Sequence, residues 1–176
     1  MKNIGFIGAG RMATALGKGC VEAGLVPVGS VLASDPVDAA RQKFASELPG
    51  VKLVDDNAAV LAGATTIVLA VKPQMMNEVL AGIRPLVTPQ HLLVSIAAGV
   101  ALKKLAAALP PGSRLIRVMP NTPCLIGMGA SCFSRGATAT DVDVYQSHAC
   151  ARLADGTVRC WGEDTYGQLG DGSGTT

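Results

Sequence analysis

The chain has 176 residues, of which 49% are hydrophobic and 16% are charged, so it is not a disordered chain and is long enough for one good core with a small appendage. The formal net charge is +2 and no run of Lys and Arg occurs, so we expect neither nucleic acid nor an anionic membrane surface as a partner. The apolar runs are too short to span a bilayer and the N-terminus lacks a secretory-signal pattern, which predicts a cytoplasmic location.

Short apolar runs alternate with longer helical patterns along the first part of the chain, which is typical of a parallel sheet covered by helices on both faces. We therefore expect an α/β fold with a Rossmann-like, doubly wound, mostly parallel sheet over residues 1–140. Composition changes after Thr140, since the only Trp and both Tyr follow it, and we expect residues 141–176 to form a short β-hairpin tail. The predicted strands are Asn3–Gly8, Val28–Ser34, Lys52–Val54, Thr66–Val71, His91–Ala97, Arg114–Met119 and Gly129–Ser134.

The first predicted helix runs from Arg11 to Ala23, and its apolar residues recur at helical spacing. Met12, Leu16, Cys20 and Ala23 are expected to form one buried stripe. The five cysteines are odd in number and lack the paired spacing of a zinc site, so we expect no metal and reduced thiols that serve packing. These cysteines are at positions 20, 124, 132, 150 and 160.

The segment Gly8-Ala9-Gly10-Arg11-Met12-Ala13 lies directly between the first strand and the first helix. This G-x-G-x-x-A pattern supplies a tight turn at Gly8, close approach of the backbone to a pyrophosphate at Gly10, and a small residue at Ala13 where the helix packs on the strand. Amides at the helix start would face the pyrophosphate, and the helix dipole favours its charge. The alternative is a glycine-rich turn without a ligand.

The second strand ends at Ser34, and Asp35 follows it at close to the spacing of about 20 residues expected for an acidic residue that binds the adenosine ribose. A carboxylate there would repel a 2′-phosphate, and the nearest counter-charge is Arg41, so the sequence favours NADH over NADPH. The alternative role for Asp35 is to cap the helix that follows Pro36.

Two further loops follow predicted strands, at the edge where open α/β sheets bind ligands. They are Leu69-Ala70-Val71-Lys72-Pro73-Gln74 and Arg117-Val118-Met119-Pro120-Asn121-Thr122-Pro123. With KNIGFIGAGRMATAL and VSIAAGV, the segments LAVKPQMM and RVMPNTPCLIGMGAS resemble the N-terminal half of pyrroline-5-carboxylate reductase over residues 1–140. The resemblance implies hydride transfer from NADH or NADPH to the C=N carbon of a small-molecule imine, 1-pyrroline-5-carboxylate, giving L-proline.

The resemblance also assigns site residues. Lys72 and Asn57 keep alternative roles, as a solvated loop lysine and as a helix cap. The commoner residue at the position of Asp35 in the family is small or polar, which puts NADPH use in doubt. The catalytic residues are unknown, and the implied cofactor contacts are Ile7, Gly8, Ala9, Gly10, Arg11, Met12, Ser34, Asp35, Asn57, Val71, Lys72, Ala98, Asn121 and Thr122.

Members of that family continue into a helical domain that forms the dimer and binds the substrate carboxylate, whereas this sequence leaves the family pattern after Gly136. We therefore expect the chain to be truncated before the substrate domain, and to bind a dinucleotide without turnover by itself. A domain without its helical partner would expose apolar surface, so self-association into a homo-oligomer is a further expectation.

The tail contains Asp155-Gly156, a strong signal for a tight hairpin, and residues 148–172 resemble one regulator-of-chromosome-condensation type propeller repeat. One such repeat cannot bury its own face, because arrays need at least about 3 repeats. Pairing of Cys150 with Cys160 stays open. Three functions are compatible with the sequence: a reductase, a non-catalytic dinucleotide-binding module, and a β-repeat interaction protein.

Overall fold

The computed structural model describes residues 3–120 in full, and the backbone of residues 131–135, 139–145, 148–153 and 158–162. The predicted sheet is present, with the strand order β3-β2-β1-β4-β5-β6-β7. Its first six strands are parallel to their neighbours and β7 pairs antiparallel with β6. The strands are β1 (Ile4–Ile7), β2 (Val31–Ser34), β3 (Lys52–Leu53), β4 (Thr66–Leu69), β5 (Leu92–Ser95), β6 (Arg114–Pro120) and β7 (Ser131–Arg135).

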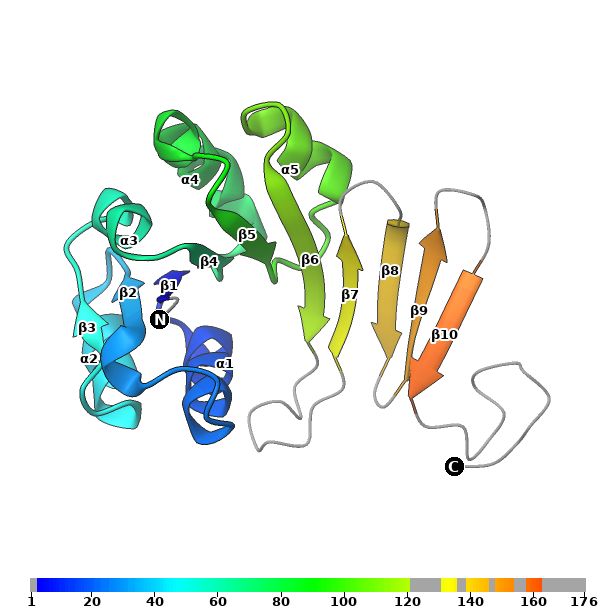
Figure 1. Ribbon diagram of the computed structural model, residues 1–176. Coiled ribbons are helices and arrows are strands. Elements are labelled where there is room, and N and C mark those ends of the chain that lie inside the picture. The colour runs from blue at the N-terminus through cyan, green and yellow to red at the C-terminus, as the bar shows by residue number, and fades with distance from the viewer. Residues whose placement is uncertain (1–2, 121–130, 136–138, 146–147, 154–157, 163–176) are drawn as a thin grey trace.

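Helices cover both faces of this sheet (Figure 1). One face carries α1 and α2, and the other carries α3, α4 and α5. The α/β, doubly wound, mostly parallel fold expected from the sequence is thereby confirmed. The helices are α1 (Arg11–Glu22), α2 (Asp38–Glu47), α3 (Asn57–Gly63), α4 (Met76–Ile83) and α5 (Leu102–Ala108), with 3₁₀ turns η1 (Val28–Ser30), η2 (Pro73–Met75) and η3 (Arg84–Leu86).

Two apolar clusters, one on each face of the sheet, form the core. Strand β1 contributes to both, because successive side chains of a strand point to opposite faces. Ile7 packs with α3, α4 and α5, whereas Phe6 packs with α1 and α2 and lies 5.6 Å from Phe44 between ring centroids. The two clusters attach the helices to both faces of the sheet.

The first helix buries a different stripe from the one predicted. Ala13 and Gly17 are its fully buried residues, because α1 approaches the sheet closely at these small positions. Leu16 and Cys20 pack at the margin of the cluster, and Ala23, which we expected to be buried, is exposed.

The second predicted strand begins later than expected. Its first three residues form η1, because Ser30 donates a backbone hydrogen bond to the Pro27 carbonyl and closes a turn. The remaining boundaries agree with the predictions to within two residues. Of the last predicted strand, Gly129 lies outside the described residues.

A second sheet, with the order β10-β9-β8, lies beside β7 (Figure 1). The antiparallel pair of β9 (His148–Leu153) and β10 (Val158–Gly162) is the predicted hairpin, with Cys150 opposite Cys160 in the backbone register. Its Asp155-Gly156 turn lies outside the described residues. Strand β8 (Ala139–Tyr145) was not predicted and adds a third strand to the hairpin.

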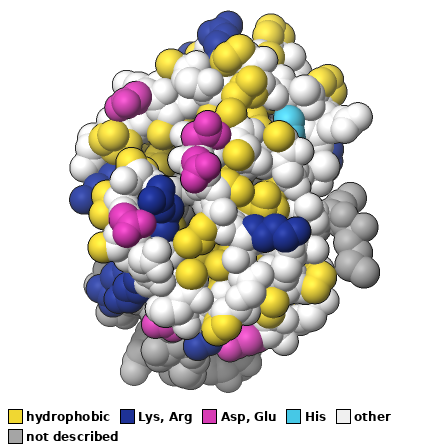
Figure 2. Space-filling view, turned by 90° about the vertical axis from the view of Figure 1, so that its left-hand side faces the viewer, with side chains coloured by type: hydrophobic (Ala, Val, Ile, Leu, Met, Phe, Trp, Pro, Cys, Tyr) yellow, Lys and Arg dark blue, Asp and Glu magenta, His cyan; other side chains and the backbone are white. Residues whose placement is uncertain are grey.

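The surface around the β3 edge mixes charges of both signs. Figure 2 shows Lys and Arg side chains interspersed with Asp and Glu, with hydrophobic side chains between them. Within the described part of the chain, no helix is long and apolar enough to cross a membrane.

The contact between β1 and α3 generates a stability prediction. A Cβ at Gly5 would collide with the Val60 side chain and lie 3.1 Å from the Ala64 Cβ. We expect Gly5→Ala to lower the free energy of unfolding by about 1–3 kcal/mol, because overpacking forces neighbours from their rotamers. Gly19→Ala is the matched control: nothing lies within 4 Å of its added Cβ, and alanine favours a helix by roughly 0.5–1 kcal/mol. Urea denaturation followed by circular dichroism measures both, and equal stabilities of the two variants would contradict the prediction.

Candidate dinucleotide site

The predicted site residues that the structure describes lie at one edge of the sheet. Because β1 to β6 are parallel, their carboxyl ends meet there, and the order β2-β1-β4 places β1 between the other two strands. The glycine-rich turn follows β1, Asp35 follows β2, and Val71 and Lys72 follow β4. Segments that are far apart in the sequence therefore meet at one edge of the sheet, at the switch point where doubly wound sheets bind their ligands.

Gly8 is fixed by two constraints. Its φ is +97°, which residues with a side chain rarely adopt. An added Cβ would also lie 2.7 Å from the Ala70 carbonyl oxygen, on the chain just after β4. The tight turn predicted at Gly8 is thus required both by its own backbone and by its neighbour.

Gly10 differs from Gly8. It is the N-cap of α1 with an extended backbone, and a Cβ built on it meets no atom within 4 Å. Packing would therefore allow a side chain at this position. Because glycine has none, the helix N-terminus is open to a ligand that approaches the backbone. Ala13, the third small residue of the pattern, is 1% exposed against the core, as the motif requires.

The hydrogen bonds of the turn show which of its amides already have an acceptor within the protein. Gly8 donates its amide to the Ser34 carbonyl at 2.9 Å, and Ala9 donates its amide to Asp35 Oδ2 at 2.8 Å. The first amides of a helix have no acceptor within the helix, and α1 has neither a side-chain cap nor an acidic residue in its first turn. The amides from Gly10 to Ala13 therefore form the part of the turn suited to an anion.

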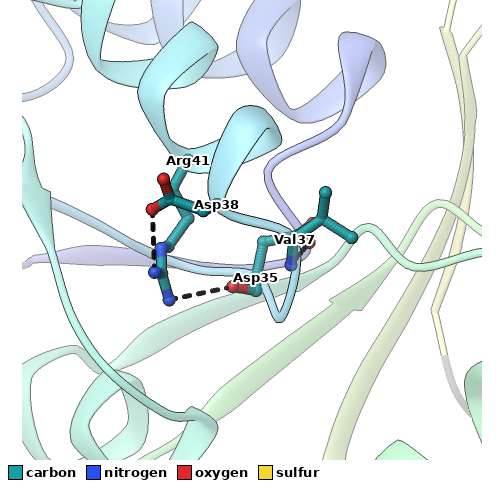
Figure 3. A network of polar contacts seen from close by, with 4 residues as sticks. All are labelled: Asp35, Val37, Asp38 and Arg41. Atoms are coloured by element: carbon teal, nitrogen blue, oxygen red, sulfur yellow. Dashed lines mark hydrogen bonds and ion pairs between the residues drawn. The ribbon is translucent and has the colours of Figure 1, made fainter.

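Asp35 lies between this turn and the start of α2 (Figure 3). Its Oδ1 accepts a hydrogen bond from the Val37 amide at 2.8 Å, and its Oδ2 accepts the bond from Ala9. The N-cap of α2 is Val37, so the alternative in which Asp35 caps this helix is wrong. Its carboxylate instead connects the glycine-rich turn to the loop after β2.

Arg41 approaches the same loop from α2. Its guanidinium donates to the Asp35 carbonyl at 3.3 Å and forms an ion pair with Asp38 at 3.0 Å (Figure 3). Arg41 is the counter-charge predicted from the sequence, whereas its ion pair with Asp38 was not predicted. The i, i+3 spacing of the two residues is the signal that would have found it.

Asn57 is joined to the end of β2. The Ser34 hydroxyl, on a residue that is 2% exposed, donates to Asn57 Oδ1 at 2.8 Å. The cap of α3 is Asp56, whose Oδ1 accepts the Ala59 amide at 2.8 Å, so the capping alternative for Asn57 is wrong. Because its oxygen is engaged by Ser34, the amide nitrogen of Asn57 is the group left for other partners.

The remaining predicted contacts lie along the same edge. Ile7 is buried beneath the turn, and Val71 is half-buried beside Gly8. Lys72 and Ala98 are exposed after β4 and β5, so the interpretation of Lys72 as a solvated loop residue stays compatible with the structure. Asn121 and Thr122 lie outside the described residues.

Other chemical groups contribute structure rather than a second site. Burial raises the pKa of the Cys20 thiol, which makes it less reactive and supports the predicted packing role. Buried His91 accepts the Thr88 amide at Nδ1, so its Nε2 carries the proton and donates to the Leu61 carbonyl at 3.0 Å. Among the described residues, no group of three or more His, Cys, Asp or Glu could hold a metal.

A depression of about 820 Å³ lies at the opposite edge of the sheet. It is lined by Ile4 and Thr66, at the amino ends of β1 and β4, and by Leu25 and Pro27 after α1. Ligands of open α/β sheets bind outside the carboxyl ends. We therefore place the dinucleotide site at the glycine-rich turn and not in this depression.

Comparisons with known proteins identify the family of the chain. The sequence profile of the family described as NADP oxidoreductase coenzyme F420-dependent matches residues 3–99, and a profile described as regulator of chromosome condensation (RCC1) repeat matches residues 139–168. Pyrroline-5-carboxylate reductase 3 of Mus musculus is 40% identical over 158 residues, which cover 88% of this chain and 57% of the mouse protein. Pyrroline-5-carboxylate reductase of Glycine max is 41% identical over 164 residues, or 93% of this chain and 58% of the plant protein.

Solved structures of pyrroline-5-carboxylate reductases are also similar to this chain. A pyrroline-5-carboxylate reductase from Coxiella burnetii is similar with a TM-score of 0.70 and 30% identity, over 76% of this chain and 49% of that one. Plasmodium falciparum pyrroline carboxylate reductase with NADP bound has a TM-score of 0.66 and 28% identity, over 76% of this chain and 48% of that one. The chain thus spans about half the length of the curated relatives it matches.

Substitution of the two glycines of the turn is expected to have different effects on stability: a large loss at Gly8 and little change at Gly10. We expect Gly8→Ala to cost at least about 2 kcal/mol of unfolding free energy, because it combines a positive φ with a contact against the Ala70 backbone. Gly10→Ala is expected to change stability by less than about 0.5 kcal/mol, since its Cβ points into open space. Urea unfolding of both variants measures the difference, and a comparable loss in Gly10→Ala would contradict the assignment of Gly10 to the ligand.

Proposed function

The chain belongs to the family described as NADP oxidoreductase coenzyme F420-dependent, and from this premise we propose that it is the dinucleotide-binding part of a pyrroline-5-carboxylate reductase. The glycine-rich turn carries the proposal. It combines a left-handed Gly8, an open Gly10 and an uncapped helix N-terminus at the carboxyl edge of a parallel sheet. This arrangement suits the pyrophosphate of a nicotinamide dinucleotide.

Each proposed contact has a chemical role. The amides from Gly10 to Met12 hold the pyrophosphate, and the Asp35 carboxylate faces the adenosine ribose. Lys72 and Ala98 lie farther along the same edge. When bound, the reduced nicotinamide supplies the hydride that converts the C=N bond of 1-pyrroline-5-carboxylate to L-proline. Asn121 and Thr122 are proposed on the nicotinamide side.

We propose NADH as the preferred cofactor. The negative charge of Asp35 would repel a 2′-phosphate at the end of β2. The nearest cation that could compensate, Arg41, is already paired with Asp38 in the free protein. Recruiting Arg41 for a phosphate would therefore disrupt an existing ion pair, which disfavours NADPH further.

A non-catalytic dinucleotide-binding module is the second candidate. It is favoured by the length of the match, because the chain spans about half of its curated relatives. Reduction of an imine requires the C=N carbon to be held close to the nicotinamide, and none of the described residues is assigned to hold the substrate. A β-repeat role for β8 to β10 has less support, since arrays need at least about 3 repeats. Cytoplasmic location and self-association stay predictions.

Dinucleotide binding is tested by titration calorimetry and by NADH fluorescence. We expect the chain to bind NADH in the micromolar range and NADPH about tenfold more weakly, corresponding to about 1.4 kcal/mol of repulsion. Gly10→Ala should bind neither cofactor measurably while it unfolds at the wild-type urea concentration, because a methyl group would occupy the place of the pyrophosphate. Absence of NADH binding by the folded wild type would overturn the proposed function.

Turnover separates the two candidates. We expect the chain by itself to bind NADH yet to show no oxidation of NADH that depends on 1-pyrroline-5-carboxylate, because the substrate is not clamped. A full-length pyrroline-5-carboxylate reductase serves as the positive control in the same assay. Substrate-dependent oxidation by this chain that is lost in Gly10→Ala would establish it as a reductase and eliminate the binding-module candidate.

A further inference from the structure

Asp35 makes two hydrogen bonds that a ribose contact alone does not require. We propose that Asp35 is a positioning residue, which holds the glycine-rich turn in its ligand-binding shape before any cofactor arrives. The part of this proposal that concerns the ligand rests on the proposed function, whereas the part that concerns the turn does not. The proposal adds a role to the carboxylate and does not replace its contact with the ribose.

The two oxygens of the Asp35 carboxylate accept from amides on different segments. Oδ2 accepts from Ala9, which is 26 positions earlier in the chain, and Oδ1 accepts from Val37, which is two positions later. Both distances are 2.8 Å, within the normal range for N–H···O bonds, and bonds to a charged acceptor are stronger than neutral ones. A single side chain thereby joins the turn after β1 to the loop after β2.

The turn is held by this bond on one side and by a close backbone contact on the other. Gly8 donates to the Ser34 carbonyl, so successive amides of the turn are bound by successive residues at the end of β2. On the opposite side, Gly8 approaches the Ala70 carbonyl after β4. Ala9 itself is 3% exposed, so its amide would lack a partner in a buried position if the carboxylate were removed. Loss of Asp35 should therefore change the direction of the amides that begin at Gly10.

The ribose contact and the positioning role are compatible. An ionised carboxylate offers about four lone-pair directions, and the amides of Ala9 and Val37 use two of them. The other two can accept the ribose hydroxyls while both amide bonds persist. Binding of the adenosine would then occur on a carboxylate whose orientation is already fixed, which reduces the entropy lost on association.

Ligands that differ only at the ribose separate the two roles. NADH is compared with an NADH analogue whose adenosine ribose lacks both hydroxyls, and both are titrated against the wild type, Asp35→Ala and the control Asp55→Ala. Asp55 is an exposed aspartate on the loop before α3, so this control removes an equal charge near the same edge. If Asp35 positions the turn, its removal lowers the affinity for both ligands by about tenfold or more. This is the effect expected for loss of a hydrogen bond to a charged group. A loss of affinity for NADH alone, with the affinity for the analogue unchanged, would overturn the proposal.

Amide hydrogen exchange tests the turn without any ligand. In Asp35→Leu, which is close to aspartate in shape but has no hydrogen-bond acceptor, the exchange rate at Ala9 is expected to rise at least about tenfold. Exchange in the core strand β4 provides the reference and should stay at the wild-type rate. An unchanged rate at Ala9 would overturn the positioning role. If the wild type binds no dinucleotide, the proposed function fails, yet the exchange measurement still decides the role of Asp35.

Discussion

The close approach of the glycine-rich turn to the end of β4 is the constraint on which the dinucleotide site depends. Gly8 lies against the Ala70 carbonyl with a left-handed backbone, and no side chain would fit between them. This contact exists because β1 and β4 are adjacent in the sheet although they are distant in the sequence. The same adjacency creates the point at which α1 leaves on one face and α3 and α4 cover the other. The position of the helix N-terminus is thus a consequence of sheet order.

Small residues at the helix–sheet contacts allow the helices to pack closely on the strands. Gly5 and Gly63 allow α3 to pack closely on β1 and β2, and Gly17 allows α1 to lie against Phe6 and Phe44. Each contact sets the distance between a helix and the strands. It therefore also sets where the loop that joins them lies relative to the sheet. The hydrogen bonds of Ser34 and Asp35 connect three of these loops. Packing sets where the loops begin, and the polar bonds at the end of β2 set how they lie.

The sequence was sufficient to predict the parallel sheet, the glycine-rich turn and the edge where site residues gather, because each depends on a local pattern. Contacts between distant segments could not be predicted this way: nothing near Ala9 indicates that a carboxylate 26 residues later accepts its amide. Asp56 and Asn57 are both good N-cap residues, so composition could not decide which of them caps α3. Strand β8 has a signal in the sequence, since Val142 and Val144 alternate with Asp141 and Asp143, but the strand crosses the expected domain boundary at Thr140.

The two amide bonds of Asp35 also bear on how such a site could change during evolution. A substitution that removes the carboxylate to admit a 2′-phosphate removes the acceptor for Ala9 in the same step. In the proposed binding mode, the gain at the ribose and the loss at the turn would therefore be inseparable at this position. A lineage that changes its cofactor would need a second substitution to support the turn, and the order of the two determines whether the intermediate protein still binds. In the proposed binding mode, cofactor preference at Asp35 would accordingly be an epistatic trait of this chain.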